Sequence, residues 1–294
     1  VRYRALQLKK GKIKRMEQRL TETDVNGQLG CNFSKLTNWT SKRENGLTRP
    51  VMQTLLGIHK EASLPKFESK RFSVLSKDSP PVRDKAAPAK DRKAVIFSTC
   101  FAEYNNASIG TATQGVLAKN GVKTEVVYPT CCGMPQLEHG DLKRVAGNAE
   151  TAAAELLPWI EGDYVVVAPI PSCALMLKFE WPLIVPDSEN IKKLAAATFD
   201  ISEYVADIAR NEGLAEGLSS VGDVTIHISC HSRAQNMGQK GAEMLRHVPG
   251  TRVNVIERCS GHGGSWGVMK DNFDTGLKIG KPAARQGLKA VEAG

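Results

Sequence analysis

The chain has 294 residues, of which 41% are hydrophobic and 24% charged, and its formal net charge is +9. This composition is typical of globular proteins of roughly two domains, and no apolar run reaches the roughly 20 residues that a membrane span needs. The seven cysteines are an odd number without a secretory signal pattern, which disfavours a secreted disulfide framework and predicts a cytoplasmic metal or redox site.

The positive charge is concentrated near the N-terminus. Residues 1–93 carry 22 Lys and Arg against 9 Asp and Glu, whereas the rest of the chain carries 18 against 22. Residues 1–20 predict a basic amphipathic helix with one apolar face, formed by Leu6, Ile13, Met16 and Leu20. Such a helix either packs on its neighbour or binds an anionic membrane surface or an acidic partner subunit. No nucleic-acid-binding motif accompanies the charge, so no nucleic acid partner is expected.

Residues 1–75 as a whole are expected to be a basic helical connector. Pro50 opens a short helical pattern that ends at Gly57. Cys31 stands alone in this segment, and a lone cysteine is more often a buried small hydrophobic residue than a ligand. Residues 76–93 contain three prolines and many charges, so they predict a linker without a core of its own.

An α/β pattern begins at residue 94, and residues 94–216 are expected to form a first domain. Three apolar runs predict buried strands, and each leads to cysteine. The cysteines concerned are Cys100, the adjacent pair Cys131 and Cys132, and Cys173. Helical patterns lie between the runs, capped at Asn105 or Asn106 and at Asp141, and a third helix is predicted over residues 190–210.

These four thiols are expected at the carboxyl ends of strands in one βαβαβ unit, where open α/β sheets bind their ligands. Neighbouring cysteines can address one site only where a strand has ended, and Gly133 lets the backbone approach a bulky group. Four thiolates can hold an iron–sulfur cluster or tetrahedral zinc. Zinc sites usually contain Cys-x₂₋₄-Cys turns, and none occurs here. We therefore predict a cluster, with zinc or four structural cysteines as alternatives.

The pattern then repeats, and residues 217–294 are expected to form a second, degenerate copy. Apolar runs again lead to Cys230 and Cys259, which are 29 positions apart, against 31 between Cys100 and Cys131. This self-similarity predicts a duplicated unit with a pseudo-twofold relation. Ser260 stands where the first copy has Cys132, and no cysteine corresponds to Cys173. A candidate second site therefore offers two thiols, Cys230 and Cys259, with His231 or His262 nearby.

Three motifs carry a family resemblance. Cys100, then Cys131-Cys132-Gly133, then Pro171-Ser-Cys173 resembles the cysteine-rich CCG domain. That domain occurs twice in iron–sulfur subunits such as those of heterodisulfide reductase and anaerobic glycerol-3-phosphate dehydrogenase. Met176 takes the place of the last cysteine in the family's Cys-x-x-Cys. Residues 1–72 resemble the connector that follows a ferredoxin-like domain in such proteins, so the sequence is expected to be a fragment lacking that domain and the extreme C-terminus.

The resemblance implies a [4Fe–4S] cluster bound by Cys100, Cys131, Cys132 and Cys173. It also implies an oxidoreductase subunit that relays electrons between a flavin-containing dehydrogenase subunit and a quinone or other carrier. A cytoplasmic location is expected, with residues 1–20 as a peripheral contact at the inner face of the cell membrane. The alternative function is a non-redox docking scaffold whose cysteines bind structural zinc or no metal.

Overall fold

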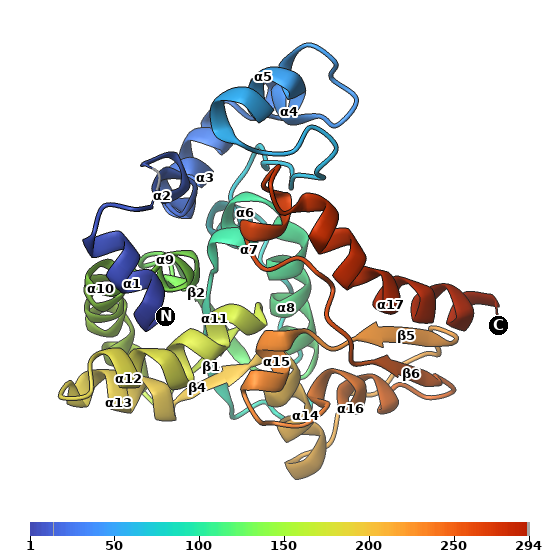
Figure 1. Ribbon diagram of the computed structural model, residues 1–294. Coiled ribbons are helices and arrows are strands. Elements are labelled where there is room, and N and C mark those ends of the chain that lie inside the picture. Colours follow the sequence, from blue (N-terminus) through green and yellow to red (C-terminus); the bar gives the residue numbers. More distant parts are fainter. Residues whose placement is uncertain (14, 293–294) are drawn as a thin grey trace.

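The computed structural model describes residues 1–13 and 15–292. It contains a helical N-terminal part, a four-stranded parallel sheet with helices on both faces, and a separate two-stranded parallel sheet (Figure 1). The predicted α/β fold class is therefore confirmed. Lys14 and residues 293–294, which belong to the predicted basic helix and second domain, lie outside the described residues. No helix in the described ranges is long and apolar enough to cross a membrane.

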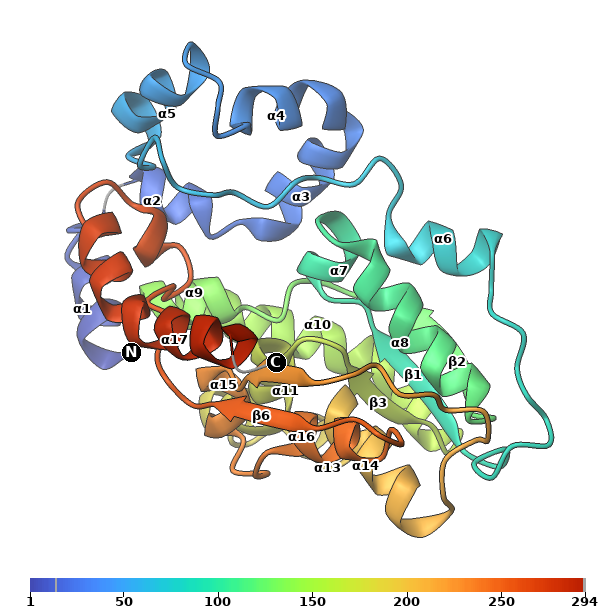
Figure 2. The ribbon, with the colours of Figure 1, turned by 90° about the vertical axis from the view of Figure 1, so that its right-hand side faces the viewer.

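The N-terminal part consists of short helices and a long irregular segment that runs back past them (Figure 2). The helices are α1 (Arg2–Lys9), α2 (Arg15–Leu20), α3 (Thr23–Asn32), α4 (Ser34–Ser41), α5 (Thr48–Leu56) and α6 (Phe72–Asp78). The side-chain amide of Asn38 in α4 exchanges two hydrogen bonds of 2.8 Å with the backbone of Phe67 in the irregular segment. The ring of Phe67 also lies against Gly30 of α3. The segment therefore ties α3 and α4 together.

The single helix predicted over residues 1–20 is wrong. The structure has α1 and α2 here, and they are separated at Gly11, whose φ of +66° is left-handed and stops the first helix. Ile13 is buried in the connection, but Leu6 and Met16 remain 46% and 40% exposed. The apolar side chains therefore do not form one continuous face. The helix predicted to end at Gly57 is confirmed as α5, and the φ of that glycine is +73°.

The four-stranded sheet has the order β2–β1–β3–β4, and all neighbouring strands are parallel. Its strands are β1 (Lys93–Phe97), β2 (Lys123–Val127), β3 (Val165–Ala168) and β4 (Thr198–Asp200). The chain leaves β1 for β2 on one side and later adds β3 on the other side. Such a reversal of strand order opens a crevice at the carboxyl ends of the two central strands, which is where sheets of this kind bind ligands.

Helices cover both faces of this sheet and give it two cores. They are α7 (Cys100–Tyr104), α8 (Ala107–Lys119), α9 (Met134–His139), α10 (Leu142–Glu161), α11 (Pro171–Leu175), α12 (Trp181–Ile184), α13 (Glu189–Ala196) and α14 (Ile201–Asn211), with a π-helical turn at Met176–Glu180. One core includes Leu156 of α10, and the other includes Leu117 of α8 and Ile208 of α14. The predicted cap of α10 is confirmed, since the Asp141 carboxylate accepts a hydrogen bond from the backbone N–H of Arg144.

The single helix predicted over residues 190–210 is also wrong. It is divided into α13 and α14 by the short strand β4, which pairs with β3. Asp200 ends this strand and caps α14, because its carboxylate accepts a hydrogen bond of 2.9 Å from the N–H of Ser202. The carboxylate of Glu203 accepts a hydrogen bond from the backbone N–H of Asp200 in return. This capping box starts a new helix at Asp200, although the spacing of apolar side chains by itself predicts that the preceding helix continues.

The irregular residues 79–92 lie against the first sheet domain. The backbone N–H groups of Asp84 and Ala89 donate hydrogen bonds of 3.0 and 3.1 Å to the carbonyls of Ala118 and Asn120, at the end of α8. Ala89 is buried. The segment is irregular, as its composition predicts, but it is packed along the domain. The domain boundaries at residues 75, 93 and 216 stay predictions.

The last part of the chain builds the two-stranded sheet. Its elements are β5 (Val224–His227), α15 (Cys230–Ala234), α16 (Lys240–Arg246), β6 (Val253–Ile256), a 3₁₀ turn at Trp266–Val268 and α17 (Phe273–Glu292). β5 and β6 are parallel, as β1 and β2 are. α15 begins at Cys230 itself, and α16 follows after a loop. The pseudo-twofold relation between the two halves stays a prediction.

Candidate metal centre

Four of the predicted cysteines follow three neighbouring strands of the first sheet. Cys100 follows β1 and is the first residue of α7, where the hydroxyl of Thr99 caps the helix by accepting from the N–H of Ala102. Cys131 and Cys132 lie in the loop after β2, and Cys173 lies in α11 after β3. Parallel strands end at the same edge of a sheet. The topology therefore brings the four thiols to the crevice between β1 and β3.

The structure places these thiols in contact with one another. The Sγ atoms of Cys132 and Cys173 are 3.1 Å apart. Cys131 lies close enough to Cys100 and Cys132 for both neighbours to shift the pKa of its thiol. Cys131, Cys132 and Cys173 are buried, Cys100 is partly buried, and all four are free thiols. The described residues therefore include one group of four neighbouring sulfurs, three of them buried and one partly buried.

Burial and the neighbouring thiols shift the pKa values of three of these cysteines in different directions. The neighbouring thiols of Cys100 and then Cys132, together with the hydrogen bond from Thr23, hold the pKa of Cys131 well below its usual value. The interaction with Cys131, followed by burial, raises the pKa of Cys100. The interactions with Cys131 and then Cys173 raise the pKa of Cys132. A negative charge is thus more stable on Cys131 than on Cys100 or Cys132.

The backbone of the two-cysteine loop is fixed by groups from two helices. The indole Nε1–H of Trp181 in α12 donates a hydrogen bond of 2.9 Å to the carbonyl of Cys132. The side-chain amide of Asn148 in α10 donates one of 3.0 Å to the carbonyl of Cys131. Gly133 has a φ of +86°, and its N–H donates to Cys131 Sγ at 3.4 Å. Gly133 also precedes the first residue of α9, in a left-handed conformation that glycine adopts at low cost.

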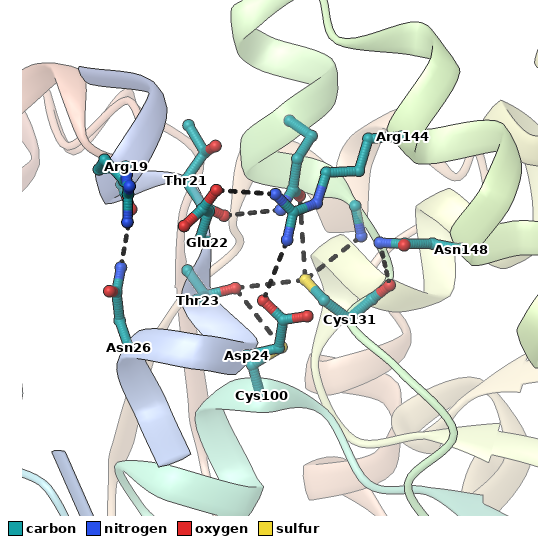
Figure 3. Close-up of polar contacts among 12 residues, drawn as sticks. Arg19, Thr21, Glu22, Thr23, Asp24, Asn26, Cys100, Cys131, Arg144 and Asn148 are labelled. Carbon is teal, nitrogen blue, oxygen red and sulfur yellow. Dashed lines mark hydrogen bonds and ion pairs between the residues drawn. The ribbon is translucent and has the colours of Figure 1, made fainter. Parts of the chain in front are cut away.

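Sequence reasoning missed two hydroxyl groups at the site. Thr23, the first residue of α3, lies with its Oγ1 3.2 Å from Cys131 Sγ and 3.5 Å from Cys100 Sγ (Figure 3). The hydroxyl of Tyr128 lies 3.2 Å from Cys100 Sγ. Burial, followed by the neighbouring Cys100 thiol, raises the pKa of Tyr128, so its hydroxyl stays protonated. Tyr128 lies just upstream of the cysteine pair, but nothing near Thr23 in the sequence indicates its role.

The candidate second site is not assembled. Cys230, Cys259 and His262 are all exposed, and no hydrogen bond joins any two of them in the part of the chain that the structure describes. The local geometry of the first copy does recur. Gly261 has a φ of +73°, and its N–H donates to Cys259 Sγ at 3.4 Å. The predicted structural role of Cys31 agrees with its burial, and its thiol donates to the carbonyl of Tyr104 at 3.3 Å.

The donor set in the first domain fits an iron–sulfur cluster in chemistry and number. Thiolates are the protein ligands of such clusters, and four of them hold a [4Fe–4S] or [2Fe–2S] unit. No three His, Cys, Asp or Glu side chains within residues 1–13 and 15–292 are spaced to hold one metal ion. Two sulfurs bound to one tetrahedral metal are about 3.8 Å apart at the usual metal–sulfur distance of about 2.3 Å. Cys132 and Cys173 must therefore move apart to ligate a metal.

Comparison with known proteins shows relatives with the same cysteine-rich unit. Residues 94–178 match a family model described as CCG, cysteine-rich domain. Lactate utilization protein A of Geobacillus thermodenitrificans is 33% identical over 189 residues, which are 60% of this chain and 74% of that protein. One subunit of anaerobic glycerol-3-phosphate dehydrogenase from Escherichia coli K12 is 25% identical over 273 residues, which are 91% of this chain and 66% of that protein.

No solved structure matches the chain. The matched domain begins in β1 and ends in the π-helical turn after Cys173, so it contains all four clustered thiols. The cysteine pattern, the family model and these relatives agree, and the chain belongs to the CCG cysteine-rich domain family.

Proposed function

We propose that this chain is the iron–sulfur electron-transfer subunit of a dehydrogenase or reductase complex. The observation that supports this most directly is the group of four free thiols that lie close together at the carboxyl edge of the sheet. Trp181 and Asn148 hold the loop of two of these thiols in place. Four apolar residues would pack better at this position than four polarizable thiols, so packing alone does not explain the cysteines.

In this proposal Cys100, Cys131, Cys132 and Cys173 bind one [4Fe–4S] cluster, which accepts and releases one electron when bound. The chain's own part is to hold the four sulfurs, to exclude water from them and to donate hydrogen bonds to them. Gly133 N–H, Thr23 and Tyr128 are the donors directed at the sulfurs. Burial and such hydrogen bonds set the reduction potential of a cluster.

We also propose a flavin-containing dehydrogenase subunit as the electron donor and a quinone or other carrier as the acceptor. One relative is named as one of the subunits of a dehydrogenase, which supports the presence of a partner subunit. The basic N-terminal part offers a surface for an acidic partner or for an anionic membrane at the cytoplasmic face, because Lys9, Lys10 and Lys12 are exposed.

The test is the iron and sulfide content of the chain after anaerobic purification, together with its EPR spectrum. We expect about four irons per chain in the wild type, and much less in Cys131→Ser and Cys132→Ser, because serine is a harder and far less acidic ligand. Cys31→Ser is the matched control, since it changes another buried cysteine that touches none of the four sulfurs. Iron unchanged in both cluster variants would refute the ligand assignment. A colourless protein that contains zinc would support the docking scaffold.

A further inference from the structure

Residues 21–24, here called the strap, cross the candidate metal centre from outside the sheet domain. They run from the end of α2 into the first turn of α3. Even Asp24, the strap residue nearest in sequence to the centre, is 76 positions before Cys100. Figure 3 shows the strap lying over Cys100 and Cys131. The N-terminal part therefore contributes to a centre whose thiols all come from the sheet domain.

Side chains of the sheet domain hold the strap on both sides of Thr23. The amide of Gln136 in α9 donates a hydrogen bond of 2.7 Å to the carbonyl of Thr21. The guanidinium of Arg144 in α10 donates one of 3.0 Å to the carboxylate of Glu22 and lies 3.7 Å from the carboxylate of Asp24. These three attachments fix the backbone on each side of Thr23, so its side chain has little freedom to turn away.

The hydroxyl of Thr23 is placed between two of the sulfurs. Its Oγ1 is 3.2 Å from Cys131 Sγ and 3.5 Å from Cys100 Sγ. A threonine hydroxyl carries one proton, so it donates to one sulfur at a time. A thiolate that binds a metal has no proton of its own, so the hydroxyl must then be the donor. Cys131 is the nearer acceptor.

We propose that Thr23 is a positioning residue that donates a hydrogen bond to the Cys131 thiolate and thereby raises the reduction potential of the centre. The inference rests on the proposed function, because it requires a redox-active metal centre on these thiols. The reduced form carries one more negative charge than the oxidised form. A donor to a ligand sulfur therefore stabilises the reduced form more, as hydrogen bonds to charged groups are the stronger ones. Tyr128 acts in the same sense on Cys100.

The experiment compares midpoint potentials of the anaerobically purified chain by EPR-monitored titration. Thr23→Val replaces the hydroxyl by a methyl group of similar size, whereas Thr23→Ser keeps the donor. Thr21→Val is the matched control, because its hydroxyl, on the same strap, donates to the carbonyl of Gln18 and touches no sulfur. We expect Thr23→Val to favour the oxidised form on the order of tenfold, a shift of about 59 mV to more negative potential for one electron.

Thr23→Ser and Thr21→Val are expected to keep the wild-type potential, and Tyr128→Phe to shift it in the same direction as Thr23→Val. Loss of iron in Thr23→Val alone, with the other two strap variants loaded, would also support the bond, because the substitution conserves volume. Equal potentials in loaded wild type and Thr23→Val would overturn the inference and leave the proposed function standing. A wild type that binds no iron would refute the proposed function itself.

Discussion

Trp181→Phe tests how far the cysteine loop depends on one hydrogen bond. Trp181 is fully buried, and its indole N–H donates to the carbonyl of Cys132 at 2.9 Å. Phenylalanine fills most of the same space but cannot donate. The substitution leaves a buried carbonyl without this partner, which costs about 1–3 kcal/mol. The lost part of the ring system adds roughly 1 kcal/mol of packing. We expect the free energy of unfolding to fall by about 2–4 kcal/mol.

The assay is urea denaturation of the metal-free chain followed by circular dichroism, because removal of a tryptophan alters fluorescence. A second measurement is the rate at which Cys132 reacts with a thiol reagent, which we expect to rise as its loop is released. Trp159→Phe is the matched control, since Trp159 is partly buried and packs edge-to-face on Tyr164 with ring centroids 5.2 Å apart. A similar loss of stability in both variants, with unchanged reactivity of Cys132, would refute the reasoning.

Three further predictions concern packing, pH and charge. Gly110→Ala is expected to destabilise the fold by about 1–3 kcal/mol in thermal unfolding, because its Cβ would lie 2.5 Å from the ring of Phe72. The control is Gly115→Ala on the same helix, whose Cβ would meet nothing within 4 Å and which should be neutral or stabilising. Burial raises the pKa of Glu138. The stability that this side chain contributes is therefore complete at low pH and is lost as the pH rises through its folded-state pKa. We expect Glu138→Gln to gain more stability relative to wild type at pH about 8 than at pH about 4. Replacing the basic side chains of residues 2–12 by glutamine should abolish sedimentation with anionic vesicles at low salt, and equal binding of both proteins would rule out the membrane contact.

The local features of the centre could be predicted from the residues along the chain. Apolar runs predicted the strands, and cysteine at the end of each run was expected at one edge of a parallel sheet. Asp141 predicted the start of α10, and Gly57 the end of α5. These features depend on a few neighbouring residues, because side-chain periodicity and capping are local properties of the backbone. The ligand set and the cluster type inferred from them stay predictions.

Local patterns were misleading where competing interactions were nearly balanced. Residues 190–210 keep a helical spacing of apolar side chains, but pairing of residues 198–200 with β3 breaks the helix. Residues 1–20 also keep such a spacing, but Gly11 adopts a left-handed conformation and the chain turns there. At residues 198–200 the tertiary pairing of a short segment outweighs a helix propensity worth only a few tenths of a kcal/mol per residue, whereas at Gly11 the glycine itself favours the break.

The distant side chains that reach the sulfurs are set by the three-dimensional packing of the chain. Thr23 and Trp181 belong to segments without a cysteine motif. Thr23 approaches the loop on the strap that Arg144 anchors, and Trp181 donates a hydrogen bond to the loop from α12. Packing also brings the thiols of the first copy together while Cys230 and Cys259 stay exposed. The physical reason is the number of strands that bring the loops together. A sheet of four strands with a reversal of order has a crevice between its central strands, and a pair of strands has none.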